Sequence, residues 1–254
     1  MTGNSWDFAS FDGVELKVHE MGEGRPIMLL HGLFSNAHTN WIKFGHAQNL
    51  ASAGFHVIMP DLRAHGESGA PHNPESYPDD VLVRDTLALI GHLNLEDYDL
   101  GGFSLGARTT AKLLVEGATP RKAILAGMGL EGLAGWERRQ DFFLKAIATK
   151  DTAKRGDPHW LAIQFMKSQK IDTVAAAYLL RTFSDLETGQ LAEIETPVQV
   201  LCGTEDRDNG DPEKLAHLLP KGNLTHIPGT HMSSVTKAEL GEGMLDFLSG
   251  SGSQ

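Results

Sequence analysis

The chain has 254 residues, of which 41% are hydrophobic and 22% charged, and its formal net charge is −11. These values are typical of one globular domain that folds without disulfides or metals, and Cys202, the one cysteine, cannot form an intrachain disulfide. The acidic balance argues against nucleic acid as a partner, and no apolar run approaches the roughly 20 residues that a membrane helix needs.

The first residues, MTGNSWDF, show no basic segment followed by an apolar one, so we expect no signal peptide and a cytoplasmic location. The next residues alternate in polarity and turn at Asp12-Gly13, which predicts a β-hairpin. Short apolar runs then predict buried parallel strands at 26–31, 55–60, 98–102, 122–127, 198–203 and 223–228. Helical stretches lie between them, near 38–53, 79–94, 105–117, 212–219 and 234–248. This alternation predicts an α/β fold with a doubly wound, mostly parallel sheet.

Residues 131–187 interrupt the alternation with helical stretches only, at 136–150, 158–169 and 172–183. Because they fall between two predicted strands, we expect a helical cap inserted into a single domain that spans residues 1–254. The cap starts near GMGLEG (127–132), which has the G-x-G-x-x-G spacing of a dinucleotide site. That spacing follows a late strand here and precedes a helix, so we predict a flexible start of the cap and no cofactor.

The sequence Gly102-Phe103-Ser104-Leu105-Gly106 joins a predicted strand to a predicted helix. A serine in such an elbow is held in a tight, strained turn that lifts its hydroxyl above the sheet. The glycines on either side let the strand and the helix approach closely. We therefore predict Ser104 as a nucleophile, the alternative being a serine that caps an ordinary helix.

A serine hydroxyl needs a base, and twelve histidines are available. Catalytic groups in open α/β sheets gather at the carboxyl ends of the strands, and His231 follows the last predicted strand. Asp206 follows the strand before it and is predicted to hold the second ring nitrogen of His231. Glu205 and Asp208 are the rival acids, each expected to be a solvated loop charge.

A tetrahedral intermediate also needs two N–H groups for its oxyanion. The backbone N–H groups of Leu105 and of Leu33, in the loop His31-Gly32-Leu33-Phe34, are predicted to supply them, with His31 holding that loop. An apolar substrate pocket is predicted from residues that flank the site or lie in the cap: Phe34, Met128, Leu130, Trp136 and Met232. No histidine spacing matches a metal site, so no metal is expected.

Five motifs occur along the chain in this order: HG (31–32), PDLRAHGES (60–68), GFSLG (102–106), GTED (203–206) and PGTH (228–231). On these motifs the chain resembles the α/β-hydrolase superfamily over its whole length except the cap. The resemblance implies the triad order Ser, Asp, His and a DLRAHGES loop that shapes the sheet edge. The serine separates the chain from haloalkane dehalogenases and epoxide hydrolases, which use aspartate there. The loop HGLFSNA lacks the HGGPG of proline iminopeptidases, the HGxGPG of carbon–carbon bond hydrolases and the HGGG of some lipases, so small bacterial serine esterases with a short cap are the nearest likeness.

The expected function is therefore hydrolysis of small to medium carboxylic esters, with a small-molecule substrate and neither nucleic acid nor membrane as a partner. Two alternatives stay open. One is a different triad enzyme on this fold: an acyltransferase, perhydrolase, lyase or carbon–carbon hydrolase. The other is a hydrolase-fold receptor that traps a ligand without turnover. The scaffold hosts many chemistries, so the sequence leaves the physiological substrate and the oligomeric state open.

Overall fold

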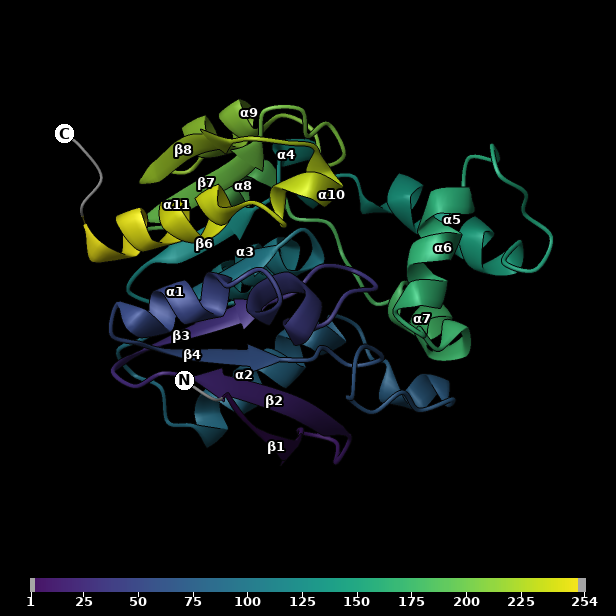
Figure 1. Cartoon of the computed structure of the whole chain (residues 1–254), viewed down its shortest axis with the longest axis horizontal. Coiled ribbons are helices and arrows are strands. Elements are labelled where there is room, and N and C mark those ends of the chain that lie inside the picture. The colour runs from purple at the N-terminus through teal and green to yellow at the C-terminus, as the bar shows by residue number, and fades with distance from the viewer. Residues whose placement is uncertain (1–2, 251–254) are drawn as a thin grey trace.

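Eight strands form one sheet in the computed structural model, which describes residues 3–250 (Figure 1). Their order across the sheet is β1-β2-β4-β3-β5-β6-β7-β8; the β1–β2 and β2–β4 pairs are antiparallel and the remaining neighbours are parallel. The strands are β1 (Asn4–Ala9), β2 (Glu15–Met21), β3 (Arg25–Leu30), β4 (Phe55–Pro60), β5 (Asp99–Phe103), β6 (Ala123–Ala126), β7 (Val198–Gly203) and β8 (Gly222–Ile227). The predicted hairpin and doubly wound sheet are confirmed.

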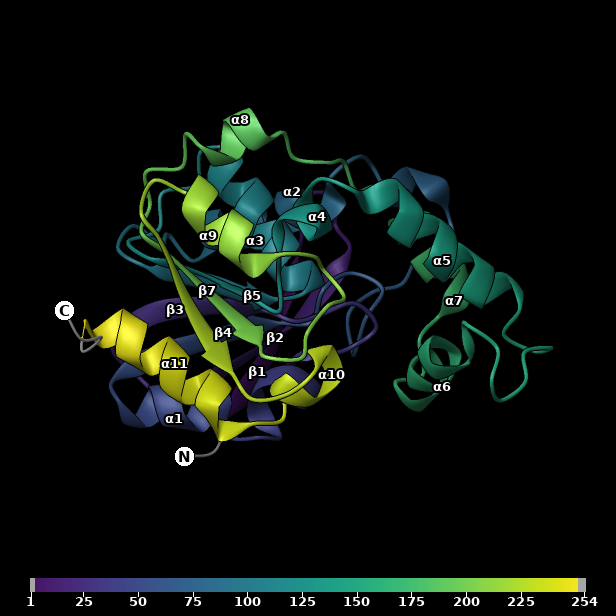
Figure 2. The same ribbon diagram turned by 90° about the horizontal axis from the view of Figure 1, so that it is seen from above.

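Helices cover both faces of the sheet (Figure 2). On one face lie α1 (His46–Ser52) and α11 (Ala238–Ser249), which pack on each other. On the other face lie α2 (Val81–His92), α3 (Leu105–Val115), α8 (Thr188–Leu191) and α9 (Pro212–Leu218). Because β5, β6 and β7 are buried along their whole length, they lack the alternating pattern of a sheet with one wet face. No helix within residues 3–250 has the length and apolar character that a membrane crossing requires.

The structure divides the helix expected at 38–53. A five-residue π-helical turn, His38–Ile42, comes first, and α1 begins at His46 after Gly45, whose φ of 83° breaks the helix. The segment expected at 234–248 also begins differently. The short helix α10 (His231–Ser234), capped by the side chain of Thr230, precedes α11. The N-cap at Thr230 therefore places His231 at the N-terminus of α10.

Three longer helices lie between β6 and β7, after the short α4 (Leu130–Leu133): α5 (Trp136–Ala148), α6 (Trp160–Ser168) and α7 (Thr173–Leu179). Figure 1 shows them set off to one side of the sheet. We keep the name cap for residues 131–187. The cap has a small apolar core of its own, which includes Trp136, Ile163 and Met166 and is completed by Phe34 from the loop after β3.

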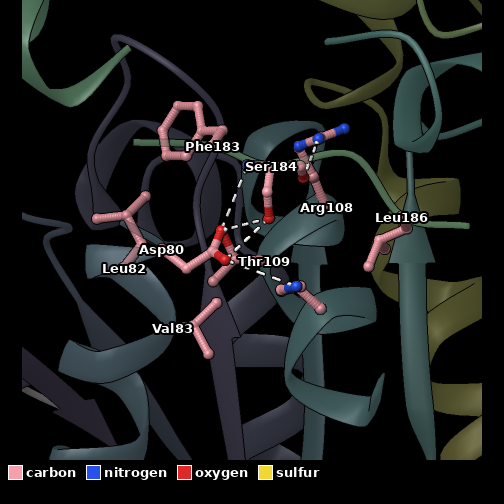
Figure 3. Close-up of a pocket in the computed structure, with 9 residues that line it drawn as sticks. Asp80, Leu82, Val83, Arg108, Thr109, Phe183, Ser184 and Leu186 are labelled. Atoms are coloured by element: carbon pink, nitrogen blue, oxygen red, sulfur yellow. Dashed lines mark hydrogen bonds and ion pairs between the residues drawn. The ribbon is translucent and has the colours of Figure 1, made fainter. Parts of the chain in front are cut away.

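Arg108 on α3 fastens both ends of the cap, as Figure 3 shows in part. One guanidinium nitrogen donates to the carbonyls of Gly132 and Leu133 at 2.7 and 2.9 Å, where the cap begins. The other donates to the Ser184 carbonyl at 2.6 Å and to the Asp185 carboxylate at 3.1 Å, where the cap returns. Beside these contacts, a hollow of about 10 Å³ is bordered by Asp80, Arg108 and Ser184 and has room for one water (Figure 3). The hydrogen bonds of Arg108 thus fasten both ends of the cap to α3.

Candidate active site

Ser104 occupies the turn between β5 and α3. Its backbone has φ 54° and ψ −109°, a combination that residues other than glycine rarely adopt. Such a conformation costs about 1–3 kcal/mol and persists only where the surroundings fix it. Part of that fixing is a 2.8 Å hydrogen bond from the Ser104 N–H to the carbonyl of Ala126 on β6. The strained turn holds a hydroxyl at the carboxyl end of the central strands.

Two glycines make this elbow possible. A Cβ added at Gly106 would lie 1.9 Å from the carbonyl oxygen of Leu30 on β3. A Cβ added at Gly102 would lie 2.2 Å from the carbonyl carbon of Gly106. Either side chain would push helix α3 away from the sheet, so the two glycines of the sequence motif are required by close backbone approach.

The structure brings Ser104, His231 and Asp206 together in one hydrogen-bonded chain. His231 Nε2 lies 3.0 Å from Ser104 Oγ, and His231 Nδ1 lies 2.8 Å from Asp206 Oδ2. The three residues come from three different turns, after β5, β7 and β8, and each is less than 10% exposed. The Phe103 ring packs on the imidazole with 5.0 Å between centroids. A carboxylate on Nδ1 leaves Nε2 free to take a proton from the serine hydroxyl.

Asp206 is held as an ionised carboxylate. Burial by itself raises its pKa, but the hydrogen bond and charge interaction with His231, the Asp208 N–H and the charge of Arg139 together outweigh burial, and the pKa is lowered from its ordinary value of 3.8. Asp206 Oδ1 also accepts from the Asp208 N–H at 3.0 Å, which turns the loop back on itself. The rival acids Glu205 and Asp208 are exposed, and neither carboxylate lies within hydrogen-bonding distance of His231.

The N–H of Leu33 makes no hydrogen bond to any residue in the range 3–250, whereas its two neighbours do. The Gly32 N–H donates to Asn40 Oδ1 at 3.2 Å, and the Phe34 N–H donates to His65 Nε2 at 2.9 Å. The loop is therefore held on both sides of Leu33 while the donor between them is left for another acceptor.

Leu105 is the first residue of α3, so its N–H has no intrahelical acceptor. No other acceptor within the described chain takes it. Leu33, Leu105 and Ser104 border the same small space. The two predicted oxyanion donors thus lie beside the predicted nucleophile, at a helix N-terminus that favours negative charge.

Two buried histidines hold the loop after β3 against the loop after β4. The ring of His31 donates from Nδ1 to the Gly32 carbonyl at 2.8 Å and accepts the Leu62 N–H on Nε2 at 2.9 Å. His65 does the same with the Arg63 carbonyl, at 3.0 Å, and the N–H of Phe34. Burial lowers the pKa of both rings, that of His65 to about 3. Both are therefore neutral parts of the scaffold.

Two spaces meet at Ser104 and Leu33. The larger has a volume of about 270 Å³, and its apolar wall includes Phe44, Phe103, Phe165, Met232 and Val235. The smaller has a volume of about 10 Å³ and lies toward the cap, bordered by Met128, Trp136, Arg139, Phe143 and Asn209. Ser104 therefore borders two spaces of unequal size.

The structure brings three of the five predicted pocket residues to these spaces: Met232 to the larger, Met128 and Trp136 to the smaller. Phe34 and Leu130 line neither. Phe34 is 2% exposed and packs edge-on against Phe143 under the cap. Leu130 packs into the core between the sheet and α9 instead.

Sequence reasoning missed Arg139 and Asn209. For Arg139 the sequence did contain a signal, its spacing along the helix from Trp136. Arg139 lies three residues after Trp136 and four before Phe143, so all three share one face of α5, and the prediction for Trp136 extends to it. Asn209 had none. Its side chain donates to the Gly127 carbonyl at 2.7 Å, a contact between loops far apart in the sequence.

Comparison with known proteins agrees with this architecture. The sequence model of the alpha/beta hydrolase fold matches residues 25–162. The AB hydrolase superfamily protein YisY of Bacillus subtilis (strain 168) is 31% identical over 76% of this chain and 79% of its own length. A protein named non-heme haloperoxidase, from Rhodococcus erythropolis, is 33% identical over 93% of this chain and 97% of its own length.

Among solved structures, the esterase EaEST from Exiguobacterium antarcticum superposes with a TM-score of 0.78 at 17% identity, covering 97% of this chain and 100% of that one. A thermophilic esterase from Thermogutta terrifontis gives 0.76 at 21% identity, covering 97% and 98%. At these identities the two structures show a shared fold and no more.

Proposed function

This chain belongs to the alpha/beta hydrolase fold family, and on that premise we propose that it hydrolyses carboxylic esters through an acyl-enzyme on Ser104. The observation that carries the proposal is the continuous chain from Ser104 Oγ through His231 to Asp206, with separations of 3.0 and 2.8 Å. A serine hydroxyl paired with an imidazole whose far nitrogen faces a carboxylate is the arrangement that acyl transfer needs.

In the proposed reaction Ser104 Oγ attacks the ester carbonyl carbon while its proton passes to His231 Nε2. The carbonyl oxygen becomes an oxyanion and accepts hydrogen bonds from the N–H groups of Leu33 and Leu105. His231 then gives its proton to the alcohol oxygen as the bond from carbonyl carbon to alcohol oxygen breaks. A water attacks the acyl-enzyme with His231 as base, and the proton it gave up returns to Ser104 as the acid leaves. Asp206 stays ionised and stabilises the imidazolium in both halves.

The pocket supports an ester with an apolar group of moderate size. The space of about 270 Å³ is bordered by aromatic and aliphatic side chains, which suit an alkyl or aryl group. Relatives of this chain include proteins named epoxide hydrolase, matched over 38–39% of its length. The residue at this chain's elbow is a serine, which favours acyl transfer over epoxide hydrolysis.

The test is hydrolysis of a series of p-nitrophenyl esters of increasing acyl length by the wild type and by Ser104→Ala. We expect kcat/KM to fall by several orders of magnitude in Ser104→Ala, since removal of a triad serine costs roughly a million-fold in subtilisin. Ser52→Ala, a change of an exposed serine at the end of α1, is the matched control and should retain full activity. Activity of Ser104→Ala within tenfold of the wild type would contradict the proposal.

A second candidate is transfer of the acyl group to hydrogen peroxide. The relative named non-heme haloperoxidase matches nearly the whole chain, which favours peroxide as the acceptor over the lyase and carbon–carbon hydrolase chemistries of this fold. The acyl-enzyme and its residues would be the same, with peroxide in place of water in the second half. Product analysis with and without peroxide separates the two, because only perhydrolysis yields a peracid. A burst of released alcohol without turnover would instead indicate a receptor.

A further inference from the structure

Arg139 brings a positive charge to the wall of the smaller space beside Ser104. It lies on α5 of the cap, and its guanidinium packs over the Phe143 ring at 5.7 Å. One nitrogen donates to the backbone carbonyl of Asp208 at 2.6 Å. Its other N–H groups make no hydrogen bond to any of residues 3–250. Free donors therefore remain on a cation that borders the nucleophile.

Two buried arginines, Arg63 and Arg108, have the carboxylate partners that Arg139 lacks. Arg63 forms ion pairs with Asp12 and Asp85 at 2.6 and 2.7 Å. Arg108 pairs with Asp185 at 3.1 Å. Within residues 3–250 no carboxylate lies within 4.0 Å of the Arg139 guanidinium. The negative charges of Asp208 and Asp206 act on Arg139 without forming an ion pair, and burial outweighs them, so the pKa of Arg139 is lowered.

Arg108 borders the same space, but its guanidinium is already occupied by three carbonyls and one carboxylate. Arg139 is therefore the cation with donors to spare. A guanidinium presents its N–H groups in a planar fork that matches a carboxylate. An anion in this space would complete the pairing that the chain itself does not supply.

We propose that the substrate is a monoester of a short dicarboxylic acid, and that Arg139 binds its free carboxylate while Ser104 attacks the ester carbonyl. This inference deepens the proposed ester hydrolysis and rests on it. The smaller space has free room of only about 10 Å³, so the spacer between the two carbonyl carbons is short, one or two methylenes, and the side chains that border the space move apart to admit the acyl group. The alcohol group then occupies the larger, apolar space.

Arg139 also links the cap to the loop that carries Asp206, through its bond to the Asp208 carbonyl. Loss of that link would lower activity on every ester alike. Carboxylate recognition instead changes the ratio between a charged and a neutral ester. The test therefore compares butyl hydrogen succinate with butyl succinamate, in which a neutral amide of the same shape replaces the carboxylate, by the rate of butanol release.

We expect the wild type to favour butyl hydrogen succinate, and the ratio of the two kcat/KM values to fall about 10- to 100-fold in Arg139→Gln. Arg139→Lys keeps the positive charge without the planar pair of N–H donors, so it should retain part of the preference for butyl hydrogen succinate. Arg138→Gln removes the same charge at the adjacent, exposed position and should leave the ratio unchanged. An unchanged ratio in Arg139→Gln, or an equal fall in Arg138→Gln, would overturn the inference.

A binding measurement separates this inference from the proposed function. The ketone 4-oxononanoate has the shape of butyl hydrogen succinate with a methylene in place of the ester oxygen, so it cannot be hydrolysed. By calorimetry we expect its Kd to rise about tenfold or more in Arg139→Gln. If neither ester is cleaved but this shift is found, ester hydrolysis fails and carboxylate recognition stands. An equal Kd in wild type and Arg139→Gln would overturn the recognition, whatever the activity.

Discussion

Replacing Arg108 with methionine removes the contacts that fasten the cap to the helix behind the nucleophile. The lost hydrogen bonds are three to the backbone carbonyls of Gly132, Leu133 and Ser184, and one to Asp185, whose side chain is 46% exposed. The exposed contact adds little. The buried carbonyls of Gly132 and Leu133 each lose a charge-assisted bond that is worth about 1.5–3 kcal/mol, and the part-buried bond to Ser184 adds less, although methionine keeps part of the apolar packing. We expect the free energy of unfolding to fall by about 3–5 kcal/mol.

The assay is urea unfolding followed by circular dichroism and tryptophan fluorescence. Arg108→Lys retains the charge but not the fork, so it should fall between the wild type and Arg108→Met. Arg138→Met, on the exposed side of α5, is the control and should change stability by no more than about 0.5 kcal/mol. A loss below about 1 kcal/mol in Arg108→Met would refute the reasoning, because it would mean that the cap is held mainly by other contacts.

Three further predictions concern the acid, the scaffold and the cap. Asp206→Asn should lower kcat roughly 10⁴-fold by favouring the wrong imidazole tautomer, whereas Glu205→Gln and Asp208→Asn should each lower it less than tenfold; an equal effect at either rival would move the assignment. Because burial lowers the pKa of His65 from 6.5 to about 3, the unfolded chain binds an extra proton between those values, and stability is lost as the pH falls below 6.5. In His65→Gln the free energy of unfolding, measured in urea at several pH values, should decrease by up to about 1.4 kcal/mol less for each unit that the pH falls. An unchanged dependence on pH would show that His65 is not held neutral. Trp136→Ala enlarges the smaller space, so the ranking of short against long acyl esters should shift by about 10- to 200-fold in relative kcat/KM, and an unchanged ranking would show that the cap does not line the site.

The sequence predicted the parts of this molecule that local pattern and sheet geometry determine. Apolar runs between turn residues marked the parallel strands, and the glycines around Ser104 marked the elbow. Ser104, Asp206 and His231 follow three different strands, and the carboxyl ends of parallel strands meet at one edge of the sheet. Their approach to within hydrogen-bonding distance is therefore what strand order alone leads one to expect.

The parts that sequence did not predict depend on contacts between distant loops. Phe34 lies in the predicted oxyanion loop, but its ring completes the core of the cap instead of the pocket. Arg139 shares a helix face with Trp136, yet its place beside Ser104 depends on how the cap packs over the sheet. The break at Gly45 depends on a positive φ that no local pattern required. Such features follow from tertiary packing, which overrides local preference.

The central claim is that Ser104 carries the acyl group during turnover. The most direct measurement is acid quenching during steady-state hydrolysis of p-nitrophenyl acetate, followed by mass spectrometry of the intact chain and of its peptides. We predict an acetyl group on Ser104 that builds up in a burst with p-nitrophenolate and is absent from Ser104→Ala. Acetylation of a different residue, or turnover without acetylation of Ser104 under conditions where the burst is resolved, would contradict the claim.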